Sequence, residues 1–192
     1  MKRYRGFLEL ANAGEIARRY FVMNAFDGAL TVLGIILGAY IGGVRNVNVI
    51  LSAVLGASLA MGLSGLWGAY MAEKAERLRK LKELEAALFT DLKQTRIYRA
   101  SLATMVWLAI VDGISPVVVA LASVSPFLFT RAGLCPFISA VYISIGITIT
   151  VLFTLGIFLG KISRENMVLN GLRMVSAGII IAAILLLAEA IL

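Results

Sequence analysis

The sequence predicts an all-α integral membrane protein with five transmembrane helices. Of its 192 residues 60% are hydrophobic and the mean hydropathy is +0.93, whereas a soluble domain has about 45–50% apolar residues. Five apolar stretches are each long enough to cross a bilayer as a helix, which takes about 20 residues. These predicted spans lie at about 21–43, 48–72, 103–127, 137–160 and 169–191. We expect a basic N-terminal segment at 1–20 and one membrane domain at 21–192, with a cytoplasmic helical extension at 73–102.

Basic side chains fall almost entirely on one side of the predicted spans. Sixteen of the 18 Lys and Arg residues lie in the N-terminal segment, in the loop after span two, or between spans four and five and in the first turns of span five. Only Arg45 and Arg131 lie on the opposite side. By the positive-inside rule the N-terminus is cytoplasmic and the C-terminus is outside. We expect a multi-pass protein of the cell membrane with anionic lipid at its cytoplasmic face. The net charge of +7 follows from this rule and does not indicate nucleic-acid binding.

Two residue counts exclude several kinds of chemistry. The chain has no histidine and a single cysteine, Cys135. Without histidine there is no His-based zinc site, no His general base and no Ser-His-Asp triad. One cysteine cannot form an intrachain disulfide, and no nucleophile–base pair is evident in the sequence. We therefore expect that the protein is not an enzyme and holds no permanent cofactor.

The N-terminal segment and the loop after span two carry most of the charge. Residues 1–20 interleave bases with apolar side chains, which indicates a helix on the surface of an anionic membrane; a partly disordered basic tail is the alternative. After span two, leucines recur at helical spacing up to Leu92 without Pro or Gly, so this span is expected to continue into the cytoplasm as a helix. Its charges suit a solvated face with i,i+4 pairs. The alternative is a metal-collecting surface that includes Glu73 and Glu76, since carboxylates bind hard cations.

Span one carries an acid, Asp27, whose insertion near a bilayer centre costs about 2.5–3.5 kcal/mol. At four-residue spacing Met23, Asp27 and Thr31 share one face of the helix. The same face continues through a doubled G-x-x-x-G pattern at Gly34, Gly38 and Gly42. Because this pattern lets another helix approach closely, we expect the acid to face protein rather than lipid. The stretch thus indicates a polar site in the membrane, and we expect a cation as its ligand.

Span three contains a second Asp-Gly pair that starts at Asp112. This acid and Asp27 both lie several residues inside the cytoplasmic start of their spans, about 10–15 Å deep at ~1.5 Å per residue. They could therefore converge in one layer. An internal parallel repeat would account for the two pairs, and chance recurrence is the alternative.

Pro116 follows Asp112 by four residues. A proline has no N–H, so the carbonyl of Asp112 loses its helical hydrogen bond. A helix broken there could offer an ion both a carboxylate and a carbonyl oxygen, as broken membrane helices do where they line a cavity. The alternative is an ordinary kink, with the carbonyl satisfied by Ser115 or a neighbour.

Several motifs resemble the vacuolar iron transporter family, five-span proteins that move Fe²⁺, and in some members Mn²⁺, out of the cytosol in exchange for protons. The start of span one is similar to the family's Asp-Gly motif. The late spans resemble its pattern L-F-x-L-G-x-x-x-G followed by L-R and a glycine. The matching stretches are Phe26-Asp-Gly-Ala-Leu-Thr-Val32, Gly68-Ala-Tyr70, Lys74-Ala-Glu76, Leu152-Phe-Thr-Leu-Gly156, Gly160-Lys161, Leu172-Arg173 and Gly178. The chain departs from the family by a shorter cytoplasmic region and by Gly65, which stands where the family has a methionine.

The resemblance implies a role for several residues. Asp27 would be the transport aspartate, Glu76 would match an acid of the family's metal-binding helices, and span one would line a homodimer interface. We expect a proton-coupled Fe²⁺ or Mn²⁺ transporter that moves metal out of the cytosol. In this hypothesis Asp112 completes the ion site, and Met23 or Met61 adds a softer ligand that suits Fe²⁺ over Mg²⁺. The alternative is a non-transporting membrane scaffold or a lipid-binding sensor that works through the basic helix at 74–99.

Overall fold

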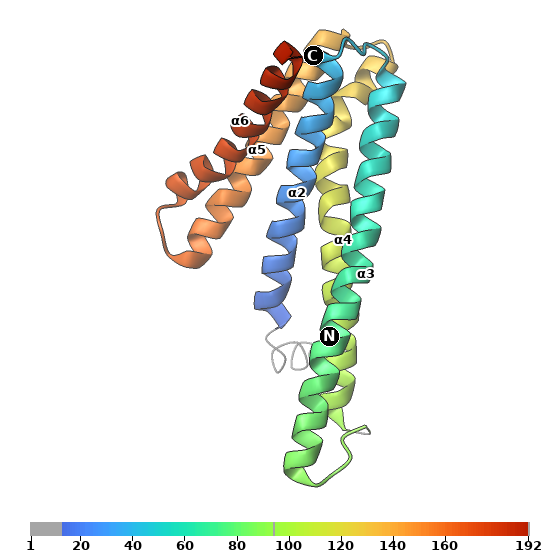
Figure 1. Ribbon diagram of the computed structural model, residues 1–192, viewed down its shortest axis with the longest axis vertical. Coiled ribbons are helices and arrows are strands. Elements are labelled where there is room, and N and C mark those ends of the chain that lie inside the picture. Colours follow the sequence, from blue (N-terminus) through green and yellow to red (C-terminus); the bar gives the residue numbers. More distant parts are fainter. Residues whose placement is uncertain (1–12, 94, 192) are drawn as a thin grey trace. The chain divides into compact units, whose positions relative to one another are not determined.

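The computed structural model describes residues 13–93 and 95–191, and the regular structure in them is helical (Figure 1). The helices are α2 (Ala13–Ile41), α3 (Val47–Leu88), α4 (Arg96–Arg131), α5 (Phe137–Ser163) and α6 (Met167–Ile191). Each of these five helices is long enough and apolar enough to cross a membrane. The predicted class, an all-α membrane protein with five spans, is confirmed.

All five helices extend beyond the predicted spans at one end or both, and the largest extensions are those of α2 and α3. Helix α2 begins at Ala13, so the last eight residues of the predicted N-terminal segment form its first two turns. Residues 1–12 of that segment lie outside the described residues. Helix α3 continues for 42 residues to Leu88 and includes much of the predicted cytoplasmic extension. Apolar runs locate the part of a helix that crosses the membrane, whereas its ends in water depend on capping and breaker residues.

Helix α4 runs without a break through Pro116, so the prediction that this residue breaks the helix is wrong. A proline inside a helix removes one backbone hydrogen bond, and its ring crowds the preceding turn. Gly28 of α2 lies directly against this part of α4. A Cβ at Gly28 would lie only 2.8 Å from the Cα of Pro116. The two helices therefore approach closely at the proline.

The chain divides into two compact units, and α2, α3 and α4 each contribute a different stretch to both. The first unit consists of described residues up to 24 and residues 62–114. The second consists of residues 25–61 and residues from 115 onward, so it includes all of α5 and α6. Asp27 thus belongs to the second unit and Asp112 to the first, and their predicted convergence in one layer stays a prediction.

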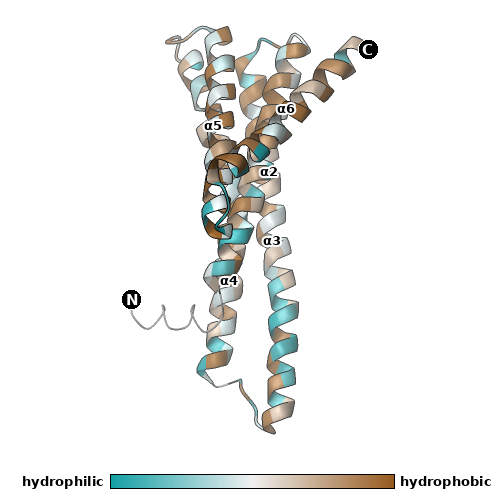
Figure 2. Cartoon of the chain, turned by 90° about the vertical axis from the view of Figure 1, so that its left-hand side faces the viewer, coloured by the Kyte–Doolittle hydropathy of each residue, from teal (hydrophilic) through white to brown (hydrophobic). Residues whose placement is uncertain are grey.

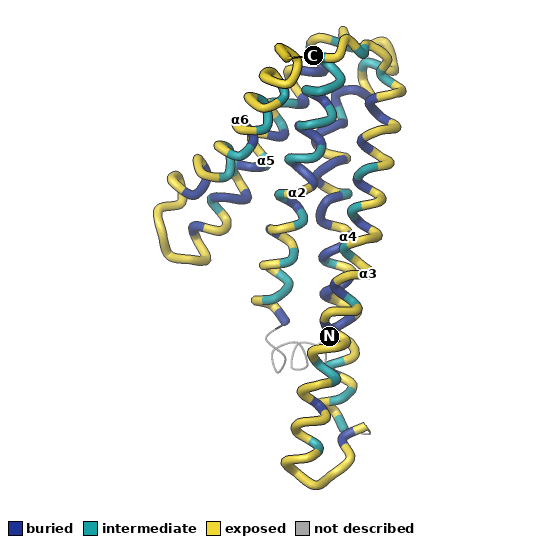
Figure 3. Tube along the Cα trace, in the orientation of Figure 1, coloured by how far each residue is buried: buried dark blue, intermediate teal, exposed yellow. Residues whose placement is uncertain are grey.

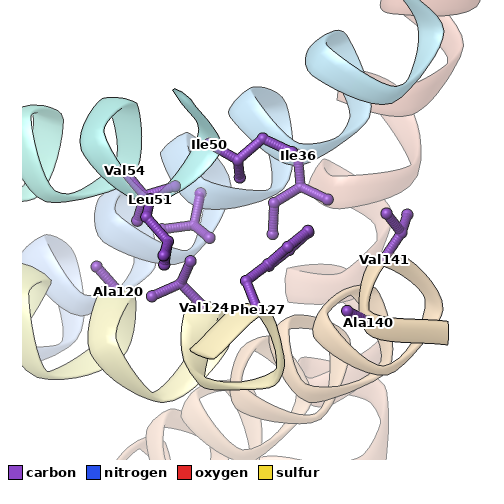
Figure 4. Packing of buried hydrophobic residues seen from close by; sticks show 10 residues of the cluster. Ile36, Ile50, Leu51, Val54, Ala120, Val124, Phe127, Ala140 and Val141 are labelled. Atoms are coloured by element: carbon purple, nitrogen blue, oxygen red, sulfur yellow. The ribbon is translucent and has the colours of Figure 1, made fainter. Parts of the chain in front are cut away.

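The core of the second unit is a cluster of apolar side chains around Phe127 (Figure 4). Phe127 is fully buried, and its ring meets that of Phe137 edge-on with centroids 5.9 Å apart. The surrounding residues come from α2, α3, α4 and α5: Val32, Ile36, Ile50, Leu51, Val54, Ala120, Val124, Ala140 and Val141. In a bilayer this close packing stabilises the bundle through dispersion contacts, since the lipid tails are as apolar as the core.

Helices α5 and α6 of the second unit pack so closely that the contact requires glycine. A Cβ at Gly156 would lie 2.4 Å from the carbonyl oxygen of Asn170 and 2.6 Å from the Cα of Gly171. Beside this contact, Asn170 donates through Nδ2 to Oε2 of Glu165 at 3.1 Å and accepts from Nη1 of Arg173 at 3.3 Å. The rest of α6 is largely exposed within the chain (Figure 3), as expected for a helix that faces lipid or another subunit.

In the first unit, hydrophilic residues concentrate in the part of α3 that follows its apolar stretch (Figure 2). Two side chains hold the return from α3 to α4. Oε1 of Glu85 accepts the N–H of Leu92 at 2.9 Å, and Oγ1 of Thr95 accepts the N–H of Tyr98 at 3.4 Å. The second bond caps the first turn of α4. The described part of the predicted cytoplasmic extension is therefore one helix and a short return.

The orientation predicted from the basic residues can be checked by thiol labelling. In a Cys135→Ser background, Arg45→Cys between α2 and α3 should react with an impermeant maleimide added to intact cells. Lys80→Cys in the charged part of α3 should react only after the membrane is opened. Both positions are exposed within the chain, so the side of the membrane and not burial decides the result. The reverse labelling pattern would contradict the orientation.

Candidate functional site

Asp112 is a buried acid in the first unit, and its residue is 4% exposed. Along α4 it is the only Asp, Glu, Lys or Arg between Arg99 and Arg131. At 1.5 Å per residue it lies about 20 Å from the first of these bases and about 29 Å from the second. A carboxylate so far from either charged end of an apolar helix is rare in membrane proteins and marks a candidate functional site.

Three helices of the first unit build the surroundings of this carboxylate. Nδ2 of Asn24, on α2, donates a hydrogen bond to Oδ1 of Asp112. On α3, Gly65 leaves the room that the other oxygen needs, because a Cβ there would lie 2.9 Å from Oδ2. The next residue of α4, Gly113, approaches α3 just as closely, since its Cβ would lie 2.8 Å from the carbonyl oxygen of Gly62. Gly65 thus leaves room for the acid, and Gly113 lets α4 approach α3 beside it.

This arrangement suits a group that exchanges a proton for a cation. Burying an ionised carboxylate is costly unless donors or a cation compensate its charge. The Asn24 amide supplies one such donor to Asp112. The charged form can take a metal ion through its oxygens, and protonation removes the charge and so weakens the metal bond. The chemistry requires that the carboxylate stay in place in both forms, which the packing around it favours.

Asp27 is not covered by other parts of this chain, and whether its face meets a second chain stays a prediction. Its residue is exposed, as is Met23 on the same face, whereas Thr31 is half-buried. The buried face of α2 in the second unit is a different one and includes Ala25 and Ala29. The glycine spacing identified a face on which a helix could pack, but it did not say which chain supplies that helix.

The glycine face of α2 is also largely uncovered within the second unit. A Cβ at Gly38 would have no atom of another helix within 4 Å, and one at Gly34 would meet only Cγ2 of Ile181 at 4.0 Å. Gly42 is exposed at the end of the helix, and a Cβ there would meet only the carbonyl oxygen of Gly38. The face that carries Asp27 therefore continues as a stripe of small residues with little packed on it.

Glu73, a predicted metal ligand, is a nearly buried acid of the first unit that already has partners. Its Oε2 lies 2.9 Å from Nε of Arg77, and the hydroxyl of Tyr20 donates to its Oε1 at 3.3 Å. The side chains of the Glu73–Arg77 pair are 10% and 11% exposed. Removing one partner of such a pair leaves the other charge buried and uncompensated, so the pair is a structural contact of α3.

Glu76, the second predicted cytoplasmic ligand, is exposed and lies between two bases. Its Oε1 lies 3.2 Å from Nη2 of Arg79 and 3.1 Å from Nζ of Lys80. Hydrogen bonds from Arg79 and then from Lys80 lower the pKa of the Glu76 carboxyl in this part of α3, outside the apolar span. These pairs match the solvated face with i,i+4 charges that the sequence also allowed.

Clusters of metal-binding side chains are absent from the part of the chain that the structure describes. Among residues 13–93 and 95–191, no three or more His, Cys, Asp or Glu lie close enough together to hold a metal ion. Met61, a predicted soft ligand, is half-buried in the second unit. A metal bound by this chain would therefore take other ligands beside a carboxylate, such as amide oxygens.

Asn24 is a site residue that the sequence pattern does not identify. Asn24 precedes Asp27 by one turn and is a neutral amide in an otherwise apolar stretch. A neutral polar side chain in a membrane helix is a weak signal, because such residues often form interhelical hydrogen bonds. Its contact with Asp112 joins residues 88 positions apart and could not be read from the local pattern.

Comparisons with known proteins give one informative relative. No protein-family model matches the chain, and no solved structure matches it. The uncharacterized protein MJ0645 of Methanocaldococcus jannaschii is 37% identical over 179 residues, which cover 92% of this chain and 90% of the relative. The similarity to vacuolar iron transporters stays a resemblance in motifs. Identity at this level along nearly the whole of both sequences indicates common descent, and the chain therefore belongs to the same family as MJ0645 of Methanocaldococcus jannaschii.

Proposed function

We propose that the protein is a proton-coupled transporter that moves Fe²⁺ or Mn²⁺ out of the cytosol across the cell membrane. The observation that carries the proposal is the buried carboxylate of Asp112 within an apolar helix, held by Asn24 and given room by Gly65. Intramembrane acids of this kind belong to ion pathways and proton relays. The motif resemblance supports the choice of metal.

In this proposal Asp112 alternates between a metal-bound carboxylate and a protonated acid. The ionised form binds the divalent ion, and a proton from the other side displaces it. Asn24 has a role with and without the metal. Its Nδ2 donates to the metal-free carboxylate, and a rotation of the side-chain amide by about 180° would turn its oxygen toward a bound ion. Amide and carboxylate oxygens together suit Mn²⁺ and Fe²⁺.

We propose that Asp27 lies at a homodimer interface. An acid exposed on an apolar helix is costly against lipid, and its face continues as an uncovered glycine stripe. Packing this face on the same face of a second copy would bring Asp27 and Met23 between two chains. There they would form a second ion position, with the thioether of Met23 as the softer ligand.

The proposed interface predicts the effect of enlarging its glycines. The double variant Gly34→Leu plus Gly38→Leu should be monomeric in mild detergent, because the added side chains hold the two α2 helices apart. Little within the chain opposes these side chains, so the monomer should stay folded. Light scattering with a detergent correction measures the protein mass and so gives the oligomeric state. The matched control is Gly56→Leu, at a helical glycine without a close neighbour. A monomeric wild type, or a dimeric double variant, would contradict the interface.

The proposed function is tested by metal uptake into vesicles. Purified protein in proteoliposomes should take up radiolabelled Fe²⁺ or Mn²⁺ when the vesicles are acidic inside, and empty liposomes should not. An excess of Mg²⁺ should compete poorly if a softer ligand contributes to the site. Uptake equal to that of empty liposomes in both pH directions would exclude the proposed activity.

A further inference from the structure

The first unit contains a cavity of about 650 Å³ that the proposed transport does not use. It lies between the first turns of α2, the charged part of α3 and the first turns of α4, and we call it the basic pocket. Its apolar wall includes Leu81, Leu84 and Ile97, and its charged wall includes Arg19, Arg77 and Lys80. Its volume lies within the range of about 300–1,000 Å³ that is typical of ligand sites.

The charges of the basic pocket favour an anion over a metal ion. Three bases line it against two acids, Glu73 and Glu76. Both acids are already paired, the first with Arg77 and the second with Lys80. Among the described residues no carboxylate lies within ion-pair distance of Arg19, whose guanidinium rests near the ring of Tyr20. A divalent cation would therefore meet an excess of positive charge.

Arg77 offers hydrogen-bond donors that the described residues do not use. Its side chain is 11% exposed, and its contact with Glu73 is made through Nε. The two terminal nitrogens of its guanidinium have no acceptor among the described residues. A guanidinium carries five N–H donors, whose fork matches the oxygens of a phosphate. The unused N–H donors of this largely buried guanidinium can thus bind an anion with several oxygens.

The depth of the basic pocket indicates the source of that anion. The apolar stretch of α3 ends near Ala72, and Arg77 lies five residues further on, about 7.5 Å along the axis. A bilayer's polar layer is about 5–8 Å thick on each side, given a total of ~40–45 Å and a core of ~30 Å. With the predicted span ending at Ala72, we expect Arg77 at the level of the lipid phosphates on the predicted cytoplasmic side. The apolar wall beside it suits the start of an acyl chain.

We propose that the basic pocket binds the phosphate headgroup of an anionic phospholipid. Arg77 and Arg19 bind the phosphate oxygens, and Lys80 adds positive charge from the next turn. The apolar wall contacts the first carbons of the acyl chain. This is a defined site on the protein and differs from a general attraction of basic residues to an anionic surface. It does not rest on the proposed transport.

Native mass spectrometry of the detergent-purified protein tests the site. With equal amounts of dioleoylphosphatidylglycerol and dioleoylphosphatidylcholine, the wild type should retain the anionic lipid in about tenfold preference, equivalent to the ~1.4 kcal/mol of one decade. Arg19→Gln plus Lys80→Gln should bring the preference close to one. Ser101→Phe, which fills the pocket from α4 without changing any charge, should have the same effect.

The matched control is Lys82→Gln plus Arg96→Gln, two exposed bases outside the pocket lining. General attraction to an anionic surface would lower lipid binding by roughly fivefold per base in either double variant, whereas a defined site leaves the control at the wild-type preference. Equal loss in both pairs would overturn the proposal, as would Ser101→Phe with unchanged preference. Displacement of the lipid by excess inorganic phosphate would show a simple ion site instead. The thermal unfolding of each variant shows whether it is folded. If one of the two pocket variants is unfolded, the lipid preference of the other pocket variant tests the site.

Discussion

Replacing Gly156 by alanine should strongly destabilise the second unit. The new Cβ would lie 2.4 Å from the carbonyl oxygen of Asn170 and 2.7 Å from its carbonyl carbon. These are backbone atoms, so no side-chain rotation relieves the clash and α5 and α6 must separate. Overpacking in a tight core costs about 1–3 kcal/mol and more where the backbone must move. At about 2–4 °C per kcal/mol for a chain of this size, a cost of ~3 kcal/mol lowers the midpoint of thermal unfolding by roughly 6–12 °C.

The control for this prediction is Gly146→Ala, in the same helix. A Cβ at Gly146 meets no atom of a neighbour within 4 Å, and alanine is the better helix former by up to about 1 kcal/mol. Its unfolding midpoint should therefore equal or exceed that of the wild type. Equal midpoints for Gly156→Ala and Gly146→Ala would show that α5 and α6 do not pack in the way described.

Replacing Asp112 by asparagine should greatly reduce metal flux while leaving the fold intact. Asparagine keeps the size of the side chain, and a neutral amide is cheaper to bury in the membrane than a carboxylate. It carries neither the charge nor the exchangeable proton. Loss of one charged partner of a buried pair costs about 2–5 kcal/mol, which corresponds to roughly 30-fold to several thousand-fold in metal affinity. Flux measured at a metal concentration below saturation should fall accordingly.

Two further variants separate a functional Asp112 from a structural one. Asn24→Leu removes the amide that donates to Asp112 and keeps a side chain of similar size, so it should weaken flux less than Asp112→Asn. Asp27→Asn tests the second ion position, and it should reduce flux only if the dimer forms. A purely structural Asp112 predicts instead that Asp112→Asn unfolds more easily and that the surviving folded fraction transports normally.

Apolar runs and charge placement predicted much of the fold. The five spans and the helical continuation of α3 follow from segment length and from the absence of Pro and Gly after Glu73. The ion pairs of Glu73 with Arg77 and of Glu76 with Lys80 also follow from their i,i+4 spacing. The late glycine motif, noted in the sequence as a family resemblance, has a physical basis at Gly156, where α5 meets α6.

The sequence could not show which acid is buried. Helical spacing defines the face of α2 that carries Asp27, but the neighbour of that face depends on packing between distant segments. The same is true of Asp112, whose surroundings come from Asn24 and Gly65 on two other helices. Helix α4 continues through Pro116, and the close approach of Gly28, 88 positions away, is a tertiary contact that the local pattern does not contain. Each of these features depends on tertiary contacts between residues far apart in the chain.

In the proposed mechanism Asp112 couples metal movement to proton movement, and this coupling can be followed with an internal pH dye. Proteoliposomes loaded with the dye are given an inward gradient of Fe²⁺ or Mn²⁺ at equal starting pH. The wild type should move metal inward and protons outward together, so the interior becomes alkaline. Asp112→Asn, shown to be folded by its thermal unfolding, should produce neither signal. A folded Asp112→Asn protein that moves metal and protons at the wild-type rate would show that Asp112 does not couple the two ions.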